Sequence, residues 1–405
     1  MNNILHFVSY IAIPTKKKFS TNLSGYGYLV HDIATNLAKN SEVSISVMTQ
    51  SSITNEFNYK GVKILKRTWS DILLNLNVYH LLNALSVILK RKIPIKKLPN
   101  IILYFISMGY CKKVIQEGKF ELIHIHGISY YTIPLIELCE KHNFKYMVTL
   151  HGLNSFYKDP NAKISWNEKK YIKHFYENNI PVTVISEGVR KKIMEFLYLK
   201  NATNFKVINA GYEKSQSEDF IDIRKKYSIP NDCKIMLCIG GISDRKNQKQ
   251  ALASFDKIDH KIKEKLYILF LGYDTTGGEF ESKISHKNLI YCGFIPKSRI
   301  GSYYQQSDFN LIISKHEGFG LSSIEGFNSG LPLLTYADLE VVDDIFDKNA
   351  VLLINDRSDE ALAKGIVKIY RKKWDKDTII KHSQKFTINK MTEHYIEHYK
   401  QLKDD

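Results

Sequence analysis

The chain of 405 residues has little cysteine, and none of it is arranged to hold a fold together. The five cysteines are odd in number and scattered: Cys111, Cys139, Cys233, Cys238 and Cys292. Cys233 and Cys238 are too far apart in sequence for a C-x-x-C pair, and no cluster of His and Cys completes a zinc set. We therefore expect no disulfide framework and no metal site. A reducing, cytoplasmic compartment fits this cysteine pattern best.

The sequence also lacks a recognisable targeting or membrane-spanning segment. Met1 to Leu5 contain no basic region followed by a long apolar core, so we expect no signal peptide. The longest apolar candidate, residues 101–108, is far shorter than the ~20 residues that a spanning helix needs. No repeat of short period and no low-complexity tract is present. These absences favour a globular protein without an integral membrane part.

The length and the charge distribution divide the chain into two halves. A chain of 405 residues is too long for one hydrophobic core, and its 44% hydrophobic content is enough for two. Residues 1–200 carry a net charge of +14, whereas residues 201–405 carry only +2. A basic first half attracts polyanions or an anionic membrane surface, although a lysine-rich surface that only aids solubility would also be basic.

Strand-like and helix-like patterns alternate from the N-terminus onward. An apolar run over residues 4–13 predicts a first buried strand, and Gly25 and Gly27 open a helix with apolar residues at helical spacing. An alternating strand follows over residues 43–47. This β-loop-α-β order is the beginning of a doubly wound parallel sheet. The two glycines either approach a ligand or serve packing alone, and the pattern does not decide between them.

The same alternation continues through the rest of the chain. Strands end at His126, at His151-Gly152, at Ser186 and near Gly211, and the carboxyl ends of parallel strands face the crevice where ligands bind. The polar segment 213–231 predicts a hinge. A second run of strands and helices begins at Lys234, and two final helices are expected over residues 358–373 and 388–402. The fold class is therefore α/β.

The most informative stretch runs from Ser314 to Glu325. An apolar strand feeds into it and a helix leaves it, with Gly318 and Gly320 at the junction. Glycines let the backbone approach a ligand, and the start of a helix offers free N–H groups at its positive end. Glu317 and Glu325 lie on either side of the turn, and carboxylates accept hydrogen bonds from sugar hydroxyls. Read physically, Gly320, Leu321 and Ser322 would hold a diphosphate between two sugar-binding acids. An ordinary capped strand–turn–helix remains the alternative.

These residues resemble a known family. Glu317 and Glu325 match the E-x7-E motif of family 4 of the retaining glycosyltransferases, in the surroundings Glu317-Gly318-Phe319-Gly320-Leu321-Ser322 and Gly330-Leu331-Pro332. The segment Thr149-Leu150-His151-Gly152 resembles the T-x-H-G segment of the same family. The matching segments occur in the same order along nearly the whole chain. The members of the family that the chain resembles are those of bacterial surface-polysaccharide synthesis. It implies a GT-B fold, with two Rossmann-like domains facing across a cleft.

The resemblance also assigns domains and roles. It implies an acceptor domain over residues 1–212, a donor domain over 213–387, and a last helix, 388–405, that packs back on the first domain. His151 and Glu317 would orient the donor sugar, and Glu325 would hold the ribose. Phe294 and Ile295 would hold the base, and Gly25 and Gly27 would belong to the donor site. His126 has weaker support, on the acceptor side.

One position departs from the family pattern. The segment Gly240 to Asn247 resembles the family's G-R-L-x-x-x-K-N segment, whose Arg and Lys neutralise the donor diphosphate. Lys246 matches that Lys, but Gly241 stands where the family has Arg. Arg245, next to Lys246, would be the replacement cation. The resemblance implies front-face transfer that retains the anomeric configuration, with no metal and no cofactor, from a nucleotide sugar for which UDP is favoured over GDP.

A basic run suggests where a membrane would be contacted. Lys90, Arg91, Lys92, Lys96 and Lys97 lie between apolar and aromatic residues, which is typical of the interfacial layer of a bilayer. A solvated loop over two core helices is the alternative. With the charge asymmetry, this run indicates an anionic or lipid-linked saccharide acceptor at the inner face of the membrane.

Two other functions remain open at this point. A nucleotide-sugar epimerase of GT-B fold would turn over its nucleotide sugar without an acceptor. A nucleic-acid-binding protein would explain the pI of about 9.3, but no helix-turn-helix, zinc finger or RNP-type aromatic pattern is present, so no nucleic-acid partner is expected.

Overall fold

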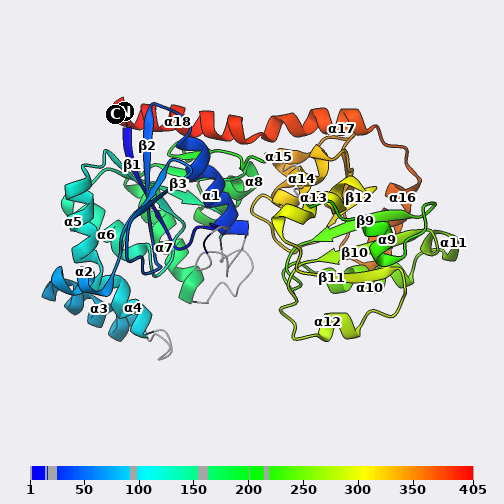
Figure 1. Cartoon of the computed structure of the whole chain (residues 1–405), viewed down its shortest axis with the longest axis horizontal. Coiled ribbons are helices and arrows are strands. Elements are labelled where there is room, and N and C mark those ends of the chain that lie inside the picture. Colours follow the sequence, from blue (N-terminus) through cyan, green and yellow to red (C-terminus); the bar gives the residue numbers. More distant parts are fainter. Residues whose placement is uncertain are drawn as a thin grey trace. The chain divides into compact units, whose positions relative to one another are not determined.

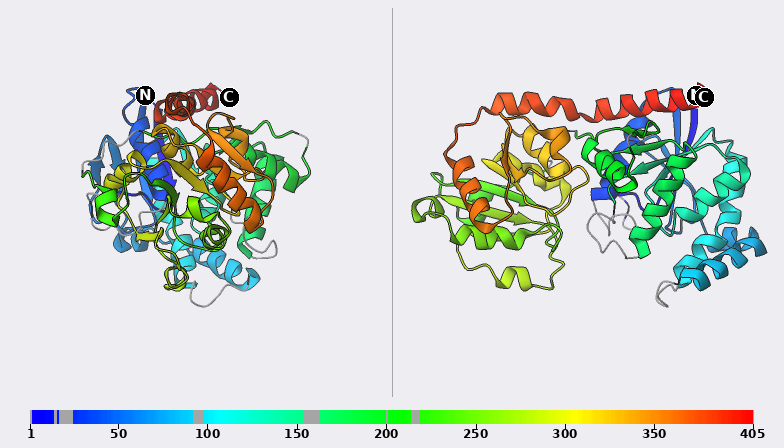
Figure 2. Two further views of the ribbon diagram at one scale, coloured as in Figure 1. Left: turned by 90° about the vertical axis from the view of Figure 1, so that its right-hand side faces the viewer. Right: turned by 180° about the vertical axis from the view of Figure 1, so that it is seen from behind.

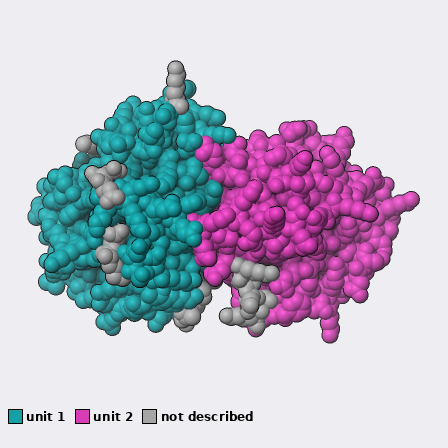
Figure 3. Space-filling view, turned by 90° about the horizontal axis from the view of Figure 1, so that it is seen from above, with its two compact units in different colours: residues 1–185, 190–209, 391–405 teal, residues 186–189, 210–390 magenta. Residues whose placement is uncertain are grey.

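The computed structural model describes residues 2–13, 16, 25–91, 98–153, 163–199, 201–213 and 219–404. These residues form two compact units, which Figure 3 shows in different colours. Unit 1 comprises Met1–Ile185, Arg190–Asn209 and Met391–Asp405, and unit 2 comprises Ser186–Val189 and Ala210–Lys390. Each unit contains one predominantly parallel sheet with helices around it (Figure 1), so the predicted α/β class is confirmed.

Unit 1 contains an eight-stranded sheet in the order β3-β4-β2-β1-β5-β6-β7-β8, in which only the β3–β4 pair is antiparallel. Its strands are β1 (Asn2–Val8), β2 (Val43–Thr49), β3 (Phe57–Tyr59), β4 (Val62–Ile64), β5 (Leu122–His126), β6 (Tyr146–Leu150), β7 (Val182–Val184) and β8 (Phe205–Val207). The first strand ends at Val8, earlier than its apolar sequence predicted. The strand order reverses direction between β1 and β5, which is where a doubly wound sheet opens a crevice at its carboxyl edge.

Helices cover both faces of this sheet (Figures 1 and 2). They are α1 (Gly25–Leu37), α2 (Trp69–Leu74), α3 (Val78–Arg91), α4 (Leu98–Ile106), α5 (Met108–Gly118), α6 (Ile133–His142), α7 (Lys163–Glu177), α8 (Glu187–Leu197) and α18 (Ile388–Asp404). Most of α18 belongs to unit 1, where the hydroxyls of Tyr395 and Tyr399 reach side chains of β5 and β6. Residues 186–189, at the start of α8, belong to unit 2 rather than to the N-terminal domain assigned from sequence.

Unit 2 contains a six-stranded parallel sheet in the order β11-β10-β9-β12-β13-β14. Its strands are β9 (Lys234–Ile239), β10 (Leu266–Leu271), β11 (Leu289–Gly293), β12 (Phe309–Ile312), β13 (Leu333–Tyr336) and β14 (Val351–Ile354). Its helices are α9 (Ile223–Tyr227), α10 (Gln248–Asp256), α11 (His260–Lys263), α12 (Glu279–Ser282), α13 (Lys297–Gln305), α14 (Leu321–Asn328), α15 (Val342–Ile345), α16 (Asp359–Arg371), α17 (Lys376–Ser383) and the short 3₁₀ helix η4 (Gln384–Phe386).

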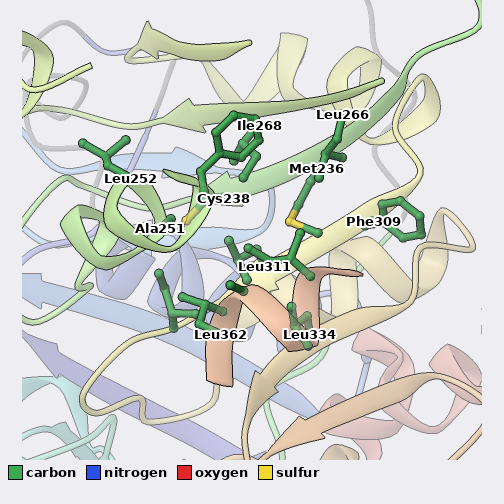
Figure 4. Close-up of a cluster of buried hydrophobic side chains, with 14 of the residues drawn as sticks. Met236, Cys238, Ala251, Leu252, Leu266, Ile268, Phe309, Leu311, Leu334 and Leu362 are labelled. Carbon is green, nitrogen blue, oxygen red and sulfur yellow. The ribbon is translucent and has the colours of Figure 1, made fainter. Parts of the chain in front are cut away.

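Successive side chains of the unit 2 strands enter two separate cores. In β9, Met236 and Cys238 pack on one face with residues of α10 and α16, whereas Ile235 and Leu237 pack on the other face with residues of α9 and α13. Figure 4 shows part of the first core, to which Leu252 of α10, Leu362 of α16, and Cys238 and Leu311 of the sheet belong. Because both faces are buried, the strands are apolar throughout, as parallel strands usually are. The sheet is thus buried on both faces, and its carboxyl edge carries the loops of the candidate site.

Among the described residues, no helix combines the length and the apolar character that crossing a membrane requires.

Candidate functional site

The topological switch point of unit 2 lies between β9 and β12. From β9 the chain builds outward through β10 to β11, and from β12 it builds in the opposite direction through β13 to β14. Ligands of doubly wound sheets bind beyond the carboxyl ends of the strands at such a point. The loop after β9 carries Arg245 and Lys246, and the loop after β12 carries Ser314 to Gly320. Two stretches that are 71 residues apart in sequence are thereby brought together.

The loop after β9 depends on close contact between two glycines. Gly240 and Gly272 follow β9 and β10 directly and have φ of +142° and +147°, a region that favours glycine. A Cβ on Gly272 would lie 2.3 Å from the carbonyl oxygen of Gly240, so the two turns leave no room for a side chain there. Gly241 differs, because a Cβ would meet only the Tyr273 carbonyl oxygen at 3.6 Å. The position where the family has Arg can therefore accept a side chain.

Glu317 forms the centre of a charged cluster at this point. Its side chain is 8% exposed and forms an ion pair with Lys246, while its other carboxylate oxygen lies 3.5 Å from Nη1 of Arg245. Ser314 Oγ donates a hydrogen bond of 2.7 Å to the oxygen that contacts Lys246. Burial alone would raise the pKa of Glu317, but the charges of Lys246 and Arg245 hold that pKa below its ordinary value of 4.5. The carboxylate is therefore ionised at neutral pH.

Arg245 shares this cluster rather than pointing away from it. Its Nη1 also donates to the carbonyl oxygen of His316 at 2.9 Å, and the side chain is 36% exposed. Two cations therefore contact one buried carboxylate beside the loop after β12. Arg245 thus contacts the same carboxylate as Lys246, and its role as the second cation toward a donor stays a prediction.

Glu340 supports the loop that carries Glu317, although no sequence motif marks it. One oxygen of Glu340 accepts a hydrogen bond of 2.9 Å from the backbone N–H of Glu317, and the other lies 2.9 Å from Nδ1 of His316. Its side chain is fully buried. Ser186 Oγ donates to the carbonyl oxygen of Gly318 at 2.7 Å, which attaches residues 186–189 to unit 2. Glu340 was not among the residues predicted for the site, and Ser186 was predicted only as the ligand-facing end of its strand, without a role.

The helix after this loop begins without a side-chain cap. Gly320 occupies the N-cap position with φ 62° and ψ 61°, so the first N–H groups of α14, including those of Leu321 and Ser322, lie at an uncapped, positive helix end. Glu325 is partly buried in the second turn of α14 and accepts a hydrogen bond of 2.7 Å from the hydroxyl of Tyr304. Phe319, by contrast, is 2% exposed and packs edge-on against Phe386, so only its backbone can contact a ligand.

The two residues predicted to hold the nucleotide base, Phe294 and Ile295, differ in their surroundings. The ring of Phe294 stacks on that of Tyr273, with ring centroids 4.5 Å apart, and Tyr273 is 62% exposed. Ile295 packs against the core of unit 2 instead. This aromatic pair, of which Tyr273 is exposed and Phe294 partly buried, lies at the carboxyl ends of β10 and β11 and offers a flat apolar surface, on which a nucleotide base can stack.

The remaining predicted residues lie in unit 1. Gly25 and Gly27 are in the first turn of α1, and a Cβ on Gly27 would lie 2.9 Å from the ring of Tyr10, which shows that Gly27 is needed for packing. His126 ends β5 and His151 follows β6, and Nδ1 of His126 lies 2.9 Å from Nε2 of His151. Burial lowers the pKa of both rings, that of His151 to about 3, so both are neutral.

The fold brings His126 beside two further buried histidines that have no sequence motif. Ring nitrogens of His6, His124 and His126 lie within 4.8 Å of one another, a spacing that could hold a metal ion. The sequence did not reveal this cluster, because His6 and His124 lie on neighbouring strands that are separated by more than a hundred residues. All six ring nitrogens of the three histidines already form hydrogen bonds to side chains.

The basic run is only partly described. Residues 92–97, and with them Lys92, Lys96 and Lys97, lie outside the described residues, and of Lys90 and Arg91 only the helical backbone is described. Of the apolar residues after the run, Ile101, Tyr104 and Phe105 are buried in unit 1. These three cannot face a bilayer, which corrects the prediction that they belong to an interfacial segment.

Two family models match consecutive parts of the chain. "Glycosyltransferase Family 4" matches residues 24–213, and "Glycosyl transferases group 1" matches residues 219–403. Together they cover nearly the whole chain, and the short region between them lies at the start of the predicted hinge, residues 213–231.

Curated relatives are distant. Alpha-monoglucosyldiacylglycerol synthase of Acholeplasma laidlawii is 24% identical over 304 residues, which are 68% of this chain and 73% of that protein. The serotype-specific mannosyltransferase WbdA of Escherichia coli is 22% identical over 220 residues, which are 50% of this chain and only 25% of that longer protein.

Solved structures resemble the chain over its whole length. Sucrose-phosphate synthase of Thermosynechococcus elongatus has a TM-score of 0.73 at 17% identity and covers 99% of both chains. Alr3699/HepE of Anabaena, in complex with UDP and glucose, has a TM-score of 0.68 at 14% identity over 99% of this chain and 100% of the other. Two parallel-sheet units, the two family models and these structural neighbours agree, and the chain belongs to the glycosyltransferases of GT-B fold, with a family 4 N-terminal part and a group 1 C-terminal part.

Proposed function

We propose that the protein is a retaining hexosyltransferase that moves a sugar from a nucleotide-sugar donor, UDP- rather than GDP-linked, to a hydroxyl group of a lipid-linked or polysaccharide acceptor. The observation that carries this proposal is the cluster of Lys246, Arg245 and Glu317 at the switch point of the unit 2 sheet, beside the uncapped start of α14. Two cations and a positive helix end suit a diphosphate, and buried carboxylates suit sugar hydroxyls.

The proposed chemistry is electrostatic. As the bond between sugar and diphosphate breaks, negative charge grows on the leaving phosphate, and Lys246, Arg245 and the first amides of α14 stabilise it. The acceptor hydroxyl attacks from the side on which the diphosphate leaves, and its proton passes to a phosphate oxygen. Because the two cations supply the positive charge, this reaction requires no metal ion. Glu317 and His151 orient the sugar, and Glu325 holds the ribose.

In the donor site, Lys246 and Glu317 neutralise each other before any donor binds. A bound diphosphate competes with Glu317 for Lys246, and sugar hydroxyls that donate to Glu317 compensate for the loss. A complete nucleotide sugar can therefore replace the interaction that Lys246 and Glu317 lose, because its diphosphate binds Lys246 and its sugar hydroxyls bind Glu317. Inorganic phosphate has no sugar hydroxyls and cannot do both. This reasoning favours binding of nucleotide sugars over free phosphate.

A thermal-shift screen tests the donor part of the proposal. UDP-, GDP- and ADP-sugars are added to the wild-type protein and to Lys246→Ala, and we expect the UDP-sugars to raise the melting temperature of the wild type most. A rise that is equally large in Lys246→Ala would place the nucleotide elsewhere. Proton NMR of the transferred sugar then reports the anomeric configuration, and inversion would contradict the retaining mechanism. Turnover of the donor to an epimer without acceptor would favour the epimerase alternative.

An exposed apolar surface in unit 1 supports a membrane-borne acceptor. Side chains of α2, of the following turn and of the first half of α3 are exposed, although they are large and apolar: Trp69, Leu73, Leu74, Leu76, Val78, Tyr79, Leu82 and Leu85. We call this the α2–α3 surface. Residues 61–119, which include it, contain eleven lysines and arginines and only two acidic residues. An apolar surface within a basic segment suits the interface of an anionic bilayer.

The α2–α3 surface, rather than the segment after Lys97, is thus the proposed membrane contact, at the cytoplasmic face. The names of two relatives fit this proposal, since one is an alpha-monoglucosyldiacylglycerol synthase and the other is a serotype-specific mannosyltransferase. Together they favour a role in the assembly of a cell-surface glycan or glycolipid.

Vesicle flotation tests the membrane contact. We expect the full-length protein to float with vesicles that contain phosphatidylglycerol, and the paired substitution Leu74→Ser and Leu82→Ser to abolish flotation without changing the melting temperature. Trp69, which is 56% exposed, is a built-in reporter: brominated lipids should quench its fluorescence, and Trp69→Phe should remove that quenching. Absence of flotation at low salt, or a stable dimer that the same paired substitution dissociates, would contradict membrane contact.

A further inference from the structure

A buried chain of hydrogen bonds runs through unit 1 behind His151. Nε2 of His151 contacts Nδ1 of His126 at 2.9 Å, and Nε2 of His126 contacts Nδ1 of His6 at 3.0 Å. Nε2 of His6 lies 3.3 Å from the hydroxyl of Tyr399, which lies 2.7 Å from Nδ1 of His124. Nε2 of His124 then contacts Oγ1 of Thr149 at 2.6 Å.

This chain crosses the centre of the sheet. His6 is on β1, His124 and His126 are on β5, and Thr149 is on β6, and His6 is directly opposite His124 in the parallel register. Tyr399 comes from α18, the last helix of the chain. Parallel strands that are buried on both faces are usually apolar, so a row of three buried histidines is unusual and needs its hydrogen bonds to be satisfied.

Neutral imidazoles restrict how the protons can be arranged. Burial lowers the pKa of all four histidines, those of His6 and His151 to about 3, so each ring carries one N–H and one acceptor nitrogen. Tyr399 likewise has one proton to donate, and among the described residues only the rings of His6 and His124 lie where they can accept it. A ring that donates to one neighbour must therefore accept from the other, and every hydrogen bond in the chain has to point in the same direction.

Only two arrangements satisfy this condition. In the first, all four rings carry the proton on Nε2, and Nδ1 of His151 is an acceptor. In the second, all four carry it on Nδ1, and Nδ1 of His151 is a donor. Nδ1 of His151 is buried and has no hydrogen-bond partner among the described residues. It is the free end of the chain.

We propose that His126, His6 and Tyr399 are positioning residues that hold His151 in a single tautomer, because they couple its ring, through the last helix of the chain, to His124 and Thr149. The kinetic part of this inference rests on the proposed function, in which His151 orients the donor sugar, but the tautomer part does not. A metal ion bridging His6, His124 and His126 is disfavoured, because it would break hydrogen bonds that use all six of their ring nitrogens.

Nitrogen NMR of the full-length protein labelled on histidine tests the tautomer part directly. Long-range correlations between ring nitrogens and ring protons identify the protonated nitrogen of each histidine. We expect His6, His124, His126 and His151 all to share one tautomer at pH 7.5. Different tautomers among the four, or a doubly protonated ring, would overturn the proposal, as would a shift of these resonances on addition of one equivalent of zinc.

A pair of matched variants tests the role of Tyr399. Tyr399→Phe removes the hydroxyl that joins His6 to His124, whereas Tyr395→Phe removes a hydroxyl of the same helix that contacts the side chains of Thr149, at 3.4 Å, and Thr183. Both positions are buried, so a merely structural role predicts similar effects. We expect only Tyr399→Phe to give His151 two tautomers and to lower kcat several-fold with the KM for donor unchanged. An unchanged His151 resonance in Tyr399→Phe would refute the coupling. Loss of the kinetic effect alone, with the tautomer changed, would instead contradict the proposed role of His151.

Discussion

The substitution Lys246→Ala removes one of the two cations that contact the buried Glu317 carboxylate. If the diphosphate of the donor binds here, the lysine makes a charge-assisted hydrogen bond to it, which contributes about 1.5–3 kcal/mol. We therefore expect UDP to bind about 10- to 150-fold more weakly to the variant than to the wild type. Isothermal titration calorimetry with UDP measures this change without knowledge of the acceptor.

Lys246→Ala should also destabilise the fold, but by less than if Lys246 were the only partner of the buried Glu317 carboxylate. Glu317 retains Arg245 at 3.5 Å and the hydrogen bond from Ser314, so its charge does not become unpaired. We expect a loss of about 1–3 kcal/mol in the free energy of unfolding, below the 3–5 kcal/mol that is typical when a buried charge loses its only partner. Urea denaturation at pH 7 gives this value.

Lys249→Ala is the matched control. Lys249 lies in the first turn of α10, three residues after Lys246, and pairs with Glu279 on the surface, with both side chains about half exposed. The Lys249→Ala variant should bind UDP as the wild type does and unfold at nearly the same urea concentration, because exposed ion pairs contribute little to stability. If Lys246→Ala also bound UDP within twofold of the wild type while folded, the diphosphate would not be at the switch point, and the reasoning would be refuted.

Three further changes probe the same site. Glu317→Gln should lower the free energy of unfolding at pH 7 and make it fall less steeply toward acidic pH. The depressed pKa of Glu317 gives stability that is present above the unfolded-state pKa of about 4.5 and is lost as the pH falls through the folded-state pKa. Denaturation at pH 3, 5 and 7 measures this, and parallel curves for variant and wild type would contradict it. Gly241→Arg should fold normally, since its Cβ has room, and should tighten UDP binding about two- to tenfold by adding a cation at the family position; weaker binding in calorimetry would count against this assignment. Tyr304→Phe removes the hydrogen bond to Glu325 and should weaken the binding of UDP. Tyr303→Phe is the control, because the Tyr303 hydroxyl contacts that of Tyr227 and not Glu325, and it should weaken binding less. Equal affinities for the two variants would show that Glu325 does not depend on Tyr304.

Much of the fold could be predicted because parallel strands and their helices leave strong local patterns. The apolar runs at β9, β10 and β12, each followed by glycine or by a polar turn, are enough to indicate the α/β class. Helix α7 was not predicted, because charged residues are as frequent in it as apolar ones and obscure its apolar face. The first strand was predicted too long, because Ile11 to Ile13 are apolar and buried although they do not pair in the sheet.

The candidate site was predictable only where residues cluster in the sequence. Lys246, Glu317 and Glu325 lie in recognisable segments, and the role proposed for each stays a prediction. Glu340 and Tyr304 hold the acidic residues in place but belong to no motif, and they become visible only when β12, β13 and α13 are assembled. The histidine chain is an extreme case. Its members lie on β1, β5 and α18, so no local pattern connects them.

The apolar surface in unit 1 illustrates a different limit. Trp69 and Leu74 look like core residues in the sequence, because hydropathy does not reveal which face of a helix lacks a partner. The basic run has apolar residues both before and after it, and the sequence does not tell which of them are exposed. Only the burial of Ile101 and Phe105 and the exposure of α2 and α3 distinguish the two sides.

A crystal structure with a bound UDP-sugar tests the central claim most directly. The account predicts that the diphosphate lies within hydrogen-bonding distance of Lys246 Nζ and of the first backbone amides of α14, and that the sugar contacts the carboxylate of Glu317. A fully occupied nucleotide bound elsewhere, with the ion pair between Lys246 and Glu317 still closed, would contradict it.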